Sequence, residues 1–237
     1  PAGLGVWAQA GVTTVRDLGQ RPGSYSFSRR DRMRADPKNA WLLAAGPLVT
    51  VPGGYPIAGN NFPSLTVDSP DDARAKVGEL IRSGADVVKI TLVSGSIPSL
   101  SPDETRAIVE TAQAAGVPVS VHATHYREFA LAVDAGVDDI AHMAVDYVPD
   151  ELMQKMIEQG TCWVPTLEAL RGGGDNLGRF AALGGCVALG NDGGFLAGLE
   201  VGMPLEEMRA MLAVGMSPMQ VIVAATRDAA RVCRVES

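Results

Sequence analysis

Apolar and polar residues follow one repeated pattern along most of the chain. A stretch with apolar residues at helical spacing ends at a glycine, and a short run rich in Val, Ile and Thr follows it. The runs show no clear apolar–polar alternation, which is typical of strands buried on both faces of a parallel sheet. The six joins are AQAG-VTTVRDL, IRSG-ADVVKITLV, AQAAG-VPVSVHA, AVDAG-VDDIAHM, IEQG-TCWVPTL and ALGG-CVALGND.

The ends of the predicted helices carry matching signals. Each glycine of these joins is placed where a residue with positive φ closes the preceding helix, a conformation that glycine adopts at little cost. These glycines are Gly11, Gly84, Gly116, Gly136, Gly160 and Gly185. Three helices are predicted to begin with Ser at the N-cap and Pro in the first turn, at Ser69-Pro70, Ser101-Pro102 and Ser217-Pro218.

A seventh strand is predicted at residues 40–50, AWLLAAGPLVT, followed by a long connection rich in Gly, Pro and Asn at residues 51–69. Helices that alternate with buried strands indicate an α/β fold with a parallel sheet, either an open doubly wound sheet or a (β/α)8 barrel. The length of 237 residues suits one such domain spanning residues 1–237.

Composition narrows the class of function. The formal net charge is −7, and the sequence has no run of Lys or Arg. This composition argues against a surface for nucleic acid or membranes and favours a small-molecule partner. The three cysteines, Cys162, Cys186 and Cys233, are widely separated and odd in number. They are therefore predicted to be reduced thiols in a cytoplasmic protein.

Polar residues end most of the predicted strands, where parallel α/β folds place their active sites. Each one alone is more often structural than functional, but two of the three histidines fall at this position together with a lysine and an aspartate. Two imidazoles and a carboxylate favour zinc, with Mn, Fe or Co as alternatives. The strand-end residues are Asp17, Lys89, Thr91, His122, His142, Thr166 and Asp192.

Lys89 lies inside the apolar run DVVKITLV. Burial disfavours the charged form of a lysine, and a neutral amine is a nucleophile. It could form a Schiff base with a carbonyl substrate, or react with CO2 to give a carbamate that bridges metal ions. His125 is interpreted as a loop or helix-start residue, because His122 ends the strand that precedes it.

Six segments together resemble the metal-dependent amidohydrolase superfamily, in particular its imidazolonepropionase and prolidase-like branch. They run in the order of that family over nearly the whole chain. The segments are AGVTTVRDLG at 10–19, DVVKI at 86–90, VSVHATH at 119–125, AGVDDIAHM at 135–143, VALGNDGG at 187–194 and GMSPMQVIVAATRDAARV at 215–232.

The resemblance implies a distorted (β/α)8 barrel that hydrolyses amide or related C–N bonds, with one or two divalent metals. Lys89 corresponds to the carboxylated, metal-bridging lysine, and His122 and His142 correspond to metal ligands. Asp192 corresponds to a further ligand that acts as the general base and proton shuttle. Tyr126 and Arg127 could contact an amide or peptide-like substrate, although an exposed helix start is the more ordinary role for them.

The sequence departs from the family pattern in two respects. Family members normally carry His-x-His on their first strand, and this chain has no such pair; it resembles the family from helix 1 onward, which predicts an incomplete barrel. The frequent GGH after strand 3 is Gly53-Gly54-Tyr55 here. An exposed barrel edge makes a homo-oligomer possible. Two alternatives stay open, a non-catalytic or partner-dependent remnant of the fold and a Schiff-base lyase that uses Lys89.

Overall fold

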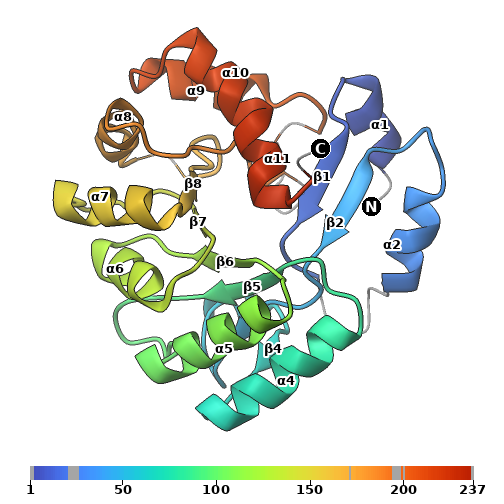
Figure 1. Ribbon diagram of the computed structural model, residues 1–237, viewed down its shortest axis with the longest axis vertical. Coiled ribbons are helices and arrows are strands. Elements are labelled where there is room, and N and C mark those ends of the chain that lie inside the picture. Colours follow the sequence, from blue (N-terminus) through green and yellow to red (C-terminus); the bar gives the residue numbers. More distant parts are fainter. Residues whose placement is uncertain (1–2, 21–26, 171, 194–198, 200, 236–237) are drawn as a thin grey trace. The chain divides into compact units, whose positions relative to one another are not determined.

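The computed structural model describes residues 3–20, 27–170, 172–193, 199 and 201–235. The chain forms two compact units, Pro1–His122 and Ala123–Ser237, and in each of them helices alternate with parallel strands (Figure 1). The predicted parallel α/β organisation is confirmed. No helix among the described residues is both long and apolar enough to cross a membrane.

The first unit contains two sets of paired parallel strands. Strand β1 pairs with β2, while β3 pairs with both β4 and β5, and β5 pairs with β6. Its elements are α1 Leu4–Gln9, β1 Thr14–Asp17, α2 Phe27–Arg34, β2 Trp41–Ala44, β3 Val49–Thr50, α3 Ile57–Asn60, β4 Leu65–Thr66, α4 Pro70–Arg82, β5 Val88–Thr91, α5 Pro102–Ala114 and β6 Val119–His122.

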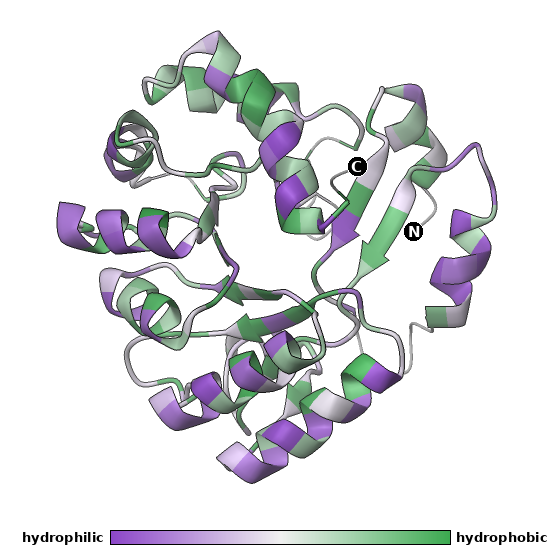
Figure 2. Ribbon diagram, in the orientation of Figure 1, coloured by the Kyte–Doolittle hydropathy of each residue, from purple (hydrophilic) through white to green (hydrophobic). Residues whose placement is uncertain are grey.

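Helices α4 and α5 begin where the sequence predicts. The Ser69 side chain accepts a hydrogen bond from Asp72 N, and Ser101 forms a capping box with Glu104. Both helices carry apolar residues on one side and polar residues on the other, and they pack against each other (Figure 2). This pattern buries the apolar side and leaves the polar side in solvent.

The region from residue 40 to residue 69 differs from the prediction. The expected single strand at 40–50 is two strands, β2 and β3, because Gly46, with a φ of 75°, and Pro47 interrupt the extended chain. The two strands also pair with different partners. The connection at 51–69 contains the short helix α3 and strand β4, which the prediction missed because each has only a few residues.

The second unit is built around strands β7 and β8, which pair in parallel. Trp163 on β8 packs edge to face against Phe129 and Phe180, with ring centroids 4.8 and 5.5 Å away, and all three side chains are fully buried. The elements are α6 Tyr126–Ala135, β7 Asp139–Ala141, α7 Asp150–Gln159, β8 Cys162–Val164, α8 Gly174–Ala182, α9 Leu205–Ala213, α10 Pro218–Ala225 and α11 Arg227–Cys233.

The last of the six predicted joins differs in detail. Five of the predicted glycines have positive φ, but in ALGG the residue with positive φ is Gly184, at 86°, and not Gly185. A Cβ on Gly185 would lie 2.4 Å from the Phe180 ring, so close packing explains this glycine. The following CVALGND forms an isolated bridge between Val187 and Trp163 where a strand was predicted.

The cysteine prediction is wrong for two of the three residues. Cys162 and Cys186 form a disulfide, with their Cα atoms 4.6 Å apart. The bridge between the following residues, Trp163 and Val187, brings them together although 24 residues separate them in the sequence. Cys233 packs against the same small cluster.

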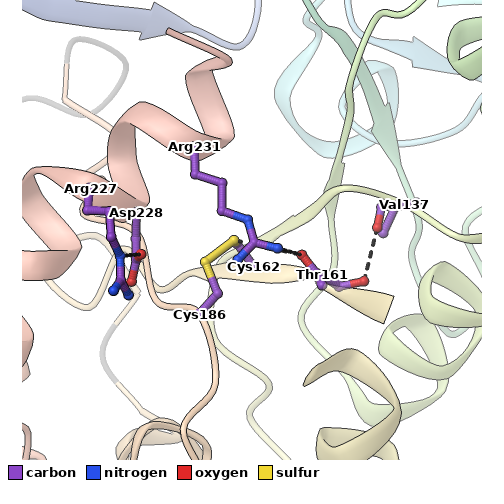
Figure 3. The surroundings of a disulfide bond; sticks show 8 residues. Val137, Thr161, Cys162, Cys186, Arg227, Asp228 and Arg231 are labelled. Atoms are coloured by element: carbon purple, nitrogen blue, oxygen red, sulfur yellow. Dashed lines mark hydrogen bonds and ion pairs between the residues drawn. A yellow bond between two sulfur atoms is a disulfide. The ribbon is translucent and has the colours of Figure 1, made fainter. Parts of the chain in front are cut away.

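The disulfide lies beside helix α11. The Arg231 side chain runs past it, and Arg231 Nη2 donates to Gly160 O at 3.2 Å (Figure 3). Disulfides are uncommon in reducing compartments such as the cytoplasm. The disulfide therefore counts against the predicted cytoplasmic location, and that location stays a prediction.

Candidate functional site

Strands β5 and β6 present one polar face. In their register Lys89 lies opposite Ser120, and Thr91 lies opposite His122. Because side chains alternate between the faces of a strand, these four point to the same side, while the apolar neighbours of each strand point to the other. Lys89 is 3% exposed, and its Nζ donates a hydrogen bond to Ser120 Oγ at 3.4 Å. The structure therefore places the buried Lys89 and the half-buried His122 on one polar face.

The His122 imidazole is held in its neutral form. Burial, and secondarily the charge of Lys89, lowers its pKa to about 3. The Tyr55 ring stacks on His122, with centroids 4.6 Å apart and an angle of 27° between the planes. The Thr91 hydroxyl donates to Tyr55 O at 2.7 Å and so anchors the loop that carries Tyr55 to β5. A neutral, fixed imidazole is suited to bind a metal ion.

Thr50 is a polar residue of this region that the sequence reasoning missed. Its side chain is fully buried, and Oγ1 has no hydrogen-bond partner among the described residues. A Cβ on Gly54 would lie 2.4 Å from Thr50 Oγ1, which shows that the Gly53-Gly54-Tyr55 turn passes close to the end of β3. The sequence signal for this contact was the glycine pair that precedes Tyr55.

His142 follows β7 directly and is 8% exposed. Its Nδ1 lies 2.8 Å from the Thr166 hydroxyl, and its carbonyl oxygen accepts a hydrogen bond from Trp163 Nε1 at 2.7 Å. Both contacts come from β8 or the residues just after it. They fix the ring and the backbone of His142, and Nε2 is then the nitrogen that we expect to bind a metal.

Three polar residues of the second unit have left-handed backbone conformations. The φ angles are 80° for His142, 50° for Thr166 and 57° for Asp192. A positive φ is uncommon outside glycine, it is costly for a β-branched residue, and it is concentrated at functional sites. All three residues were predicted from strand ends. Asp192 is exposed, and the neighbouring Asn191 is buried with its Oδ1 accepting from Gly193 N at 3.0 Å.

The other predicted residues lie at the start of α6. His125 precedes the helix, as expected, and its N–H donates to the buried Glu128 carboxylate at 3.0 Å. Tyr126 and Arg127 are the first two residues of the helix, and both are exposed. The helix-start interpretation is confirmed for all three. A contact of Tyr126 or Arg127 with substrate stays a prediction.

The four predicted metal ligands divide between the units: Lys89 and His122 belong to the first, and His142 and Asp192 belong to the second. Within the described part of the chain, no three or more His, Cys, Asp or Glu side chains form a group that could hold a metal ion. The donor types nevertheless suit a divalent ion, since two fixed imidazoles and a carboxylate are ordinary ligands. The lysine suits it only after losing its positive charge, because an ammonium group has no lone pair to offer.

Comparison with known proteins gives a consistent result. The sequence model described as the amidohydrolase family matches residues 7–237. Ochratoxinase of Aspergillus niger is 27% identical over 242 residues, which cover 88% of this chain and 49% of that protein.

Solved structures show the same relationship. The structure of a Xaa-Pro dipeptidase with bound methionine in the active site has a TM-score of 0.83 at 27% identity, covering 98% of this chain and 66% of that one. A putative prolidase from Bifidobacterium longum has a TM-score of 0.83 at 25% identity, covering 98% and 64%. The predicted amidohydrolase-type barrel fold is confirmed, and the chain spans about half the length of its curated relative and under two thirds of these two structures.

Proposed function

Since the chain belongs to the amidohydrolase family, we propose that it acts in the metal-dependent hydrolysis of amide C–N bonds in small molecules. The observation that carries this proposal is the buried polar face of β5 and β6, where Lys89 lies beside the neutral imidazole of His122. An ammonium group there would repel a metal cation. A carbamate of the same lysine would attract one, which is the role that the family pattern gives to this position.

Lys89 as its carbamate, His122, His142 and Asp192 would hold the metal. One or two divalent ions, zinc or alternatively Mn, Fe or Co, would supply Lewis acidity and lower the pKa of water when bound. His122 and His142 contribute imidazole nitrogens whose positions are fixed by Tyr55 and Thr166 respectively. This fixation reduces the reorganisation that ligand binding would otherwise require.

Asp192 is the proposed proton carrier. Its carboxylate is exposed, so it can exchange protons with water. In the proposed reaction an Asp192 oxygen takes a proton from the attacking water and delivers it to the nitrogen that leaves when the C–N bond breaks. The left-handed backbone at Asp192 sets the direction of this side chain. Tyr126 and Arg127 are proposed to contact the substrate at the start of α6.

We place the substrate among amides of amino acids and dipeptides. The support comes from relatives whose names describe a Xaa-Pro dipeptidase, a putative prolidase and an ochratoxinase. The shape of the loops that would select one substrate differs between members of a fold, so the family alone does not name it.

A second candidate is a non-catalytic or partner-dependent member of the family. It is favoured by one observation, that no group of three His, Cys, Asp or Glu side chains with metal-binding geometry occurs within the described residues. The Schiff-base lyase is disfavoured, because it gives His122, His142 and Asp192 no joint part in the reaction.

The deciding experiment measures metal and activity together. The protein is purified without added metal and then analysed for metal content by elemental analysis, with bicarbonate present. Hydrolysis of a dipeptide panel and of N-acyl amino acids is assayed with added Zn²⁺, Mn²⁺ or Co²⁺. We expect about one or two metals per chain and hydrolysis that His142→Ala abolishes.

His125→Ala is the matched control, because His125 is an exposed histidine at a helix start, and it should retain metal and activity. Absence of both metal and hydrolysis in the wild-type chain would establish the non-catalytic alternative. Borohydride trapping of a carbonyl substrate on Lys89 would establish the lyase.

A further inference from the structure

Glu207 on α9 is a fully buried acid that has no part in the proposed chemistry. Its two carboxylate oxygens each accept one backbone hydrogen bond. Oε1 accepts from Leu167 N at 2.8 Å, and Oε2 accepts from Glu168 N at 2.7 Å. The side chain thereby holds two consecutive peptide groups about 40 residues away in the sequence. No feature of the sequence around Glu207 pointed to this contact.

The two peptide groups follow Thr166 directly. Thr166 is 3% exposed and has a φ of 50°, an unusual conformation for a β-branched residue, which persists only where surrounding contacts impose it. Its carbonyl oxygen accepts from Ala169 N at 3.1 Å and Leu170 N at 3.0 Å, so it lies at the start of a tight turn. The Glu207 carboxyl group on α9 accepts the hydrogen bonds from Leu167 N and Glu168 N, and these contacts hold the turn in place.

The Thr166 hydroxyl lies 2.8 Å from Nδ1 of His142. A series of direct contacts therefore runs from the Glu207 carboxylate through the backbone after Thr166 to the His142 ring. We infer that Glu207 is a positioning residue: it fixes Thr166, and Thr166 in turn fixes the tautomer and orientation of the His142 imidazole. The consequence for metal binding rests on the proposed function, but the effect on the imidazole does not.

A carboxyl group supplies the two acceptor oxygens that this position uses. Two parallel N–H donors need two acceptors, and an amide offers one carbonyl oxygen and one NH2 group that would face a donor. Glu207→Gln keeps the size and removes one acceptor. The neighbouring Glu206 is exposed and pairs with Arg209 on the same helix, which makes Glu206→Gln the matched control.

The test uses the metal-free chain labelled with ¹⁵N-histidine. The protein has three histidines, so His142→Gln assigns the His142 signals by their loss. We expect one tautomer of His142 in the wild type and a changed or mixed tautomer in Glu207→Gln. Thr166→Val, which lacks the hydroxyl, should give the same change. Glu206→Gln and Thr166→Ser should match the wild type.

Unchanged His142 signals in a folded Glu207→Gln variant would overturn the inference. If that variant fails to fold, Glu207→Asp is measured instead. It keeps the acid group on a shorter side chain, and unchanged His142 signals in it would likewise overturn the inference. In a second measurement, Zn²⁺ affinity should fall about 10- to 100-fold in Glu207→Gln and stay unchanged in Glu206→Gln. A wild-type chain that binds no Zn²⁺ would refute the proposed function, while the histidine spectrum would still decide the role of Glu207.

Discussion

Lys89 and His122 point to the same face of two paired strands, and the charge on the lysine helps to keep the histidine neutral. The same charge opposes a metal cation at this face. The pair is therefore compatible with metal binding only when Lys89 has lost its positive charge, and carbamate formation would achieve this by adding a negative one.

Replacing Lys89 with Ala should lower the metal content of the protein by more than about 10-fold, because the proposed anionic ligand is lost. ¹³C-bicarbonate should give a carbamate signal in the wild type that Lys89→Ala lacks. Lys76→Ala is the control, since Lys76 lies on the surface of α4 in an ion pair with Asp72. Equal metal contents in Lys89→Ala and wild type would rule out this role.

The buried Glu207 carboxyl should make stability depend on pH. Burial, partly offset by its two backbone hydrogen bonds, raises the pKa of Glu207 from 4.5 to about 7. A raised folded-state pKa contributes stability that is fully present below pH 4.5 and is lost as the pH rises through about 7. The free energy of unfolding should therefore fall by roughly 3 kcal/mol over this range from this group.

Urea unfolding at pH 5, 6, 7 and 8 measures the effect, with Glu207→Gln as reference. As the pH rises, the free energy of unfolding of the wild type should fall relative to that of Glu207→Gln. If the two free energies of unfolding differ by the same amount at every pH, or if the wild type gains stability relative to the variant, the assignment of the raised pKa to Glu207 is contradicted.

Asp86 should be the most sensitive acid of the first unit. Its Oδ2 lies 2.8 Å from Arg30 Nη1 and 2.9 Å from Arg34 Nη2, and it also accepts from Ala44 N at 2.9 Å. The Arg30 and Arg34 side chains are only 8% and 14% exposed. Asp31 also pairs with both, at 2.7 and 3.8 Å, but it is 58% exposed, so removing Asp86 takes away the more buried partner of the two arginines. Asp86→Ala should cost about 3–5 kcal/mol in chemical unfolding.

Asp71→Ala is the control for Asp86. Asp71 also pairs with an arginine, Arg74, but its side chain is 96% exposed. Its loss should cost less than about 1 kcal/mol. Similar costs for the two substitutions would show that the Asp86 cluster is not the buried network described above.

The Cys162–Cys186 disulfide should stabilise the chain by about 3 kcal/mol, because it closes a loop of moderate length in the unfolded state. A reductant should lower the urea midpoint of the wild type and of Cys233→Ser equally, and leave the Cys162→Ser/Cys186→Ser variant unaffected. Alkylation in denaturant without reductant should modify one of the three cysteines. Modification of all three would contradict the disulfide.

The sequence was informative where local signals decide the structure. The serine caps at Ser69, Ser101 and Ser217 and five of the six helix-closing glycines follow from residue type and spacing. So do the place of Lys89 within β5 and the places of His122 and His142 at the ends of β6 and β7. Family resemblance added the barrel type, together with the ligand set that is proposed above.

Features that depend on contacts between distant segments were not predictable in this way. The disulfide depends on the pairing of Trp163 with Val187. Gly185 is required by the position of Phe180, and the contact of Glu207 with Leu167 joins segments 40 residues apart. The short strands β3 and β4 are also set by their neighbours, because two residues carry no periodic signal of their own.

Trp163 gives the second unit a built-in optical probe. Its indole is fully buried between two phenylalanines, and its N–H contacts the backbone of His142. Of the other two tryptophans, Trp7 is partly buried and Trp41 is 46% exposed, and both lie in the first unit. Emission from Trp163 should therefore be the most blue-shifted of the three, and it can follow events at His142 in solution without any added label.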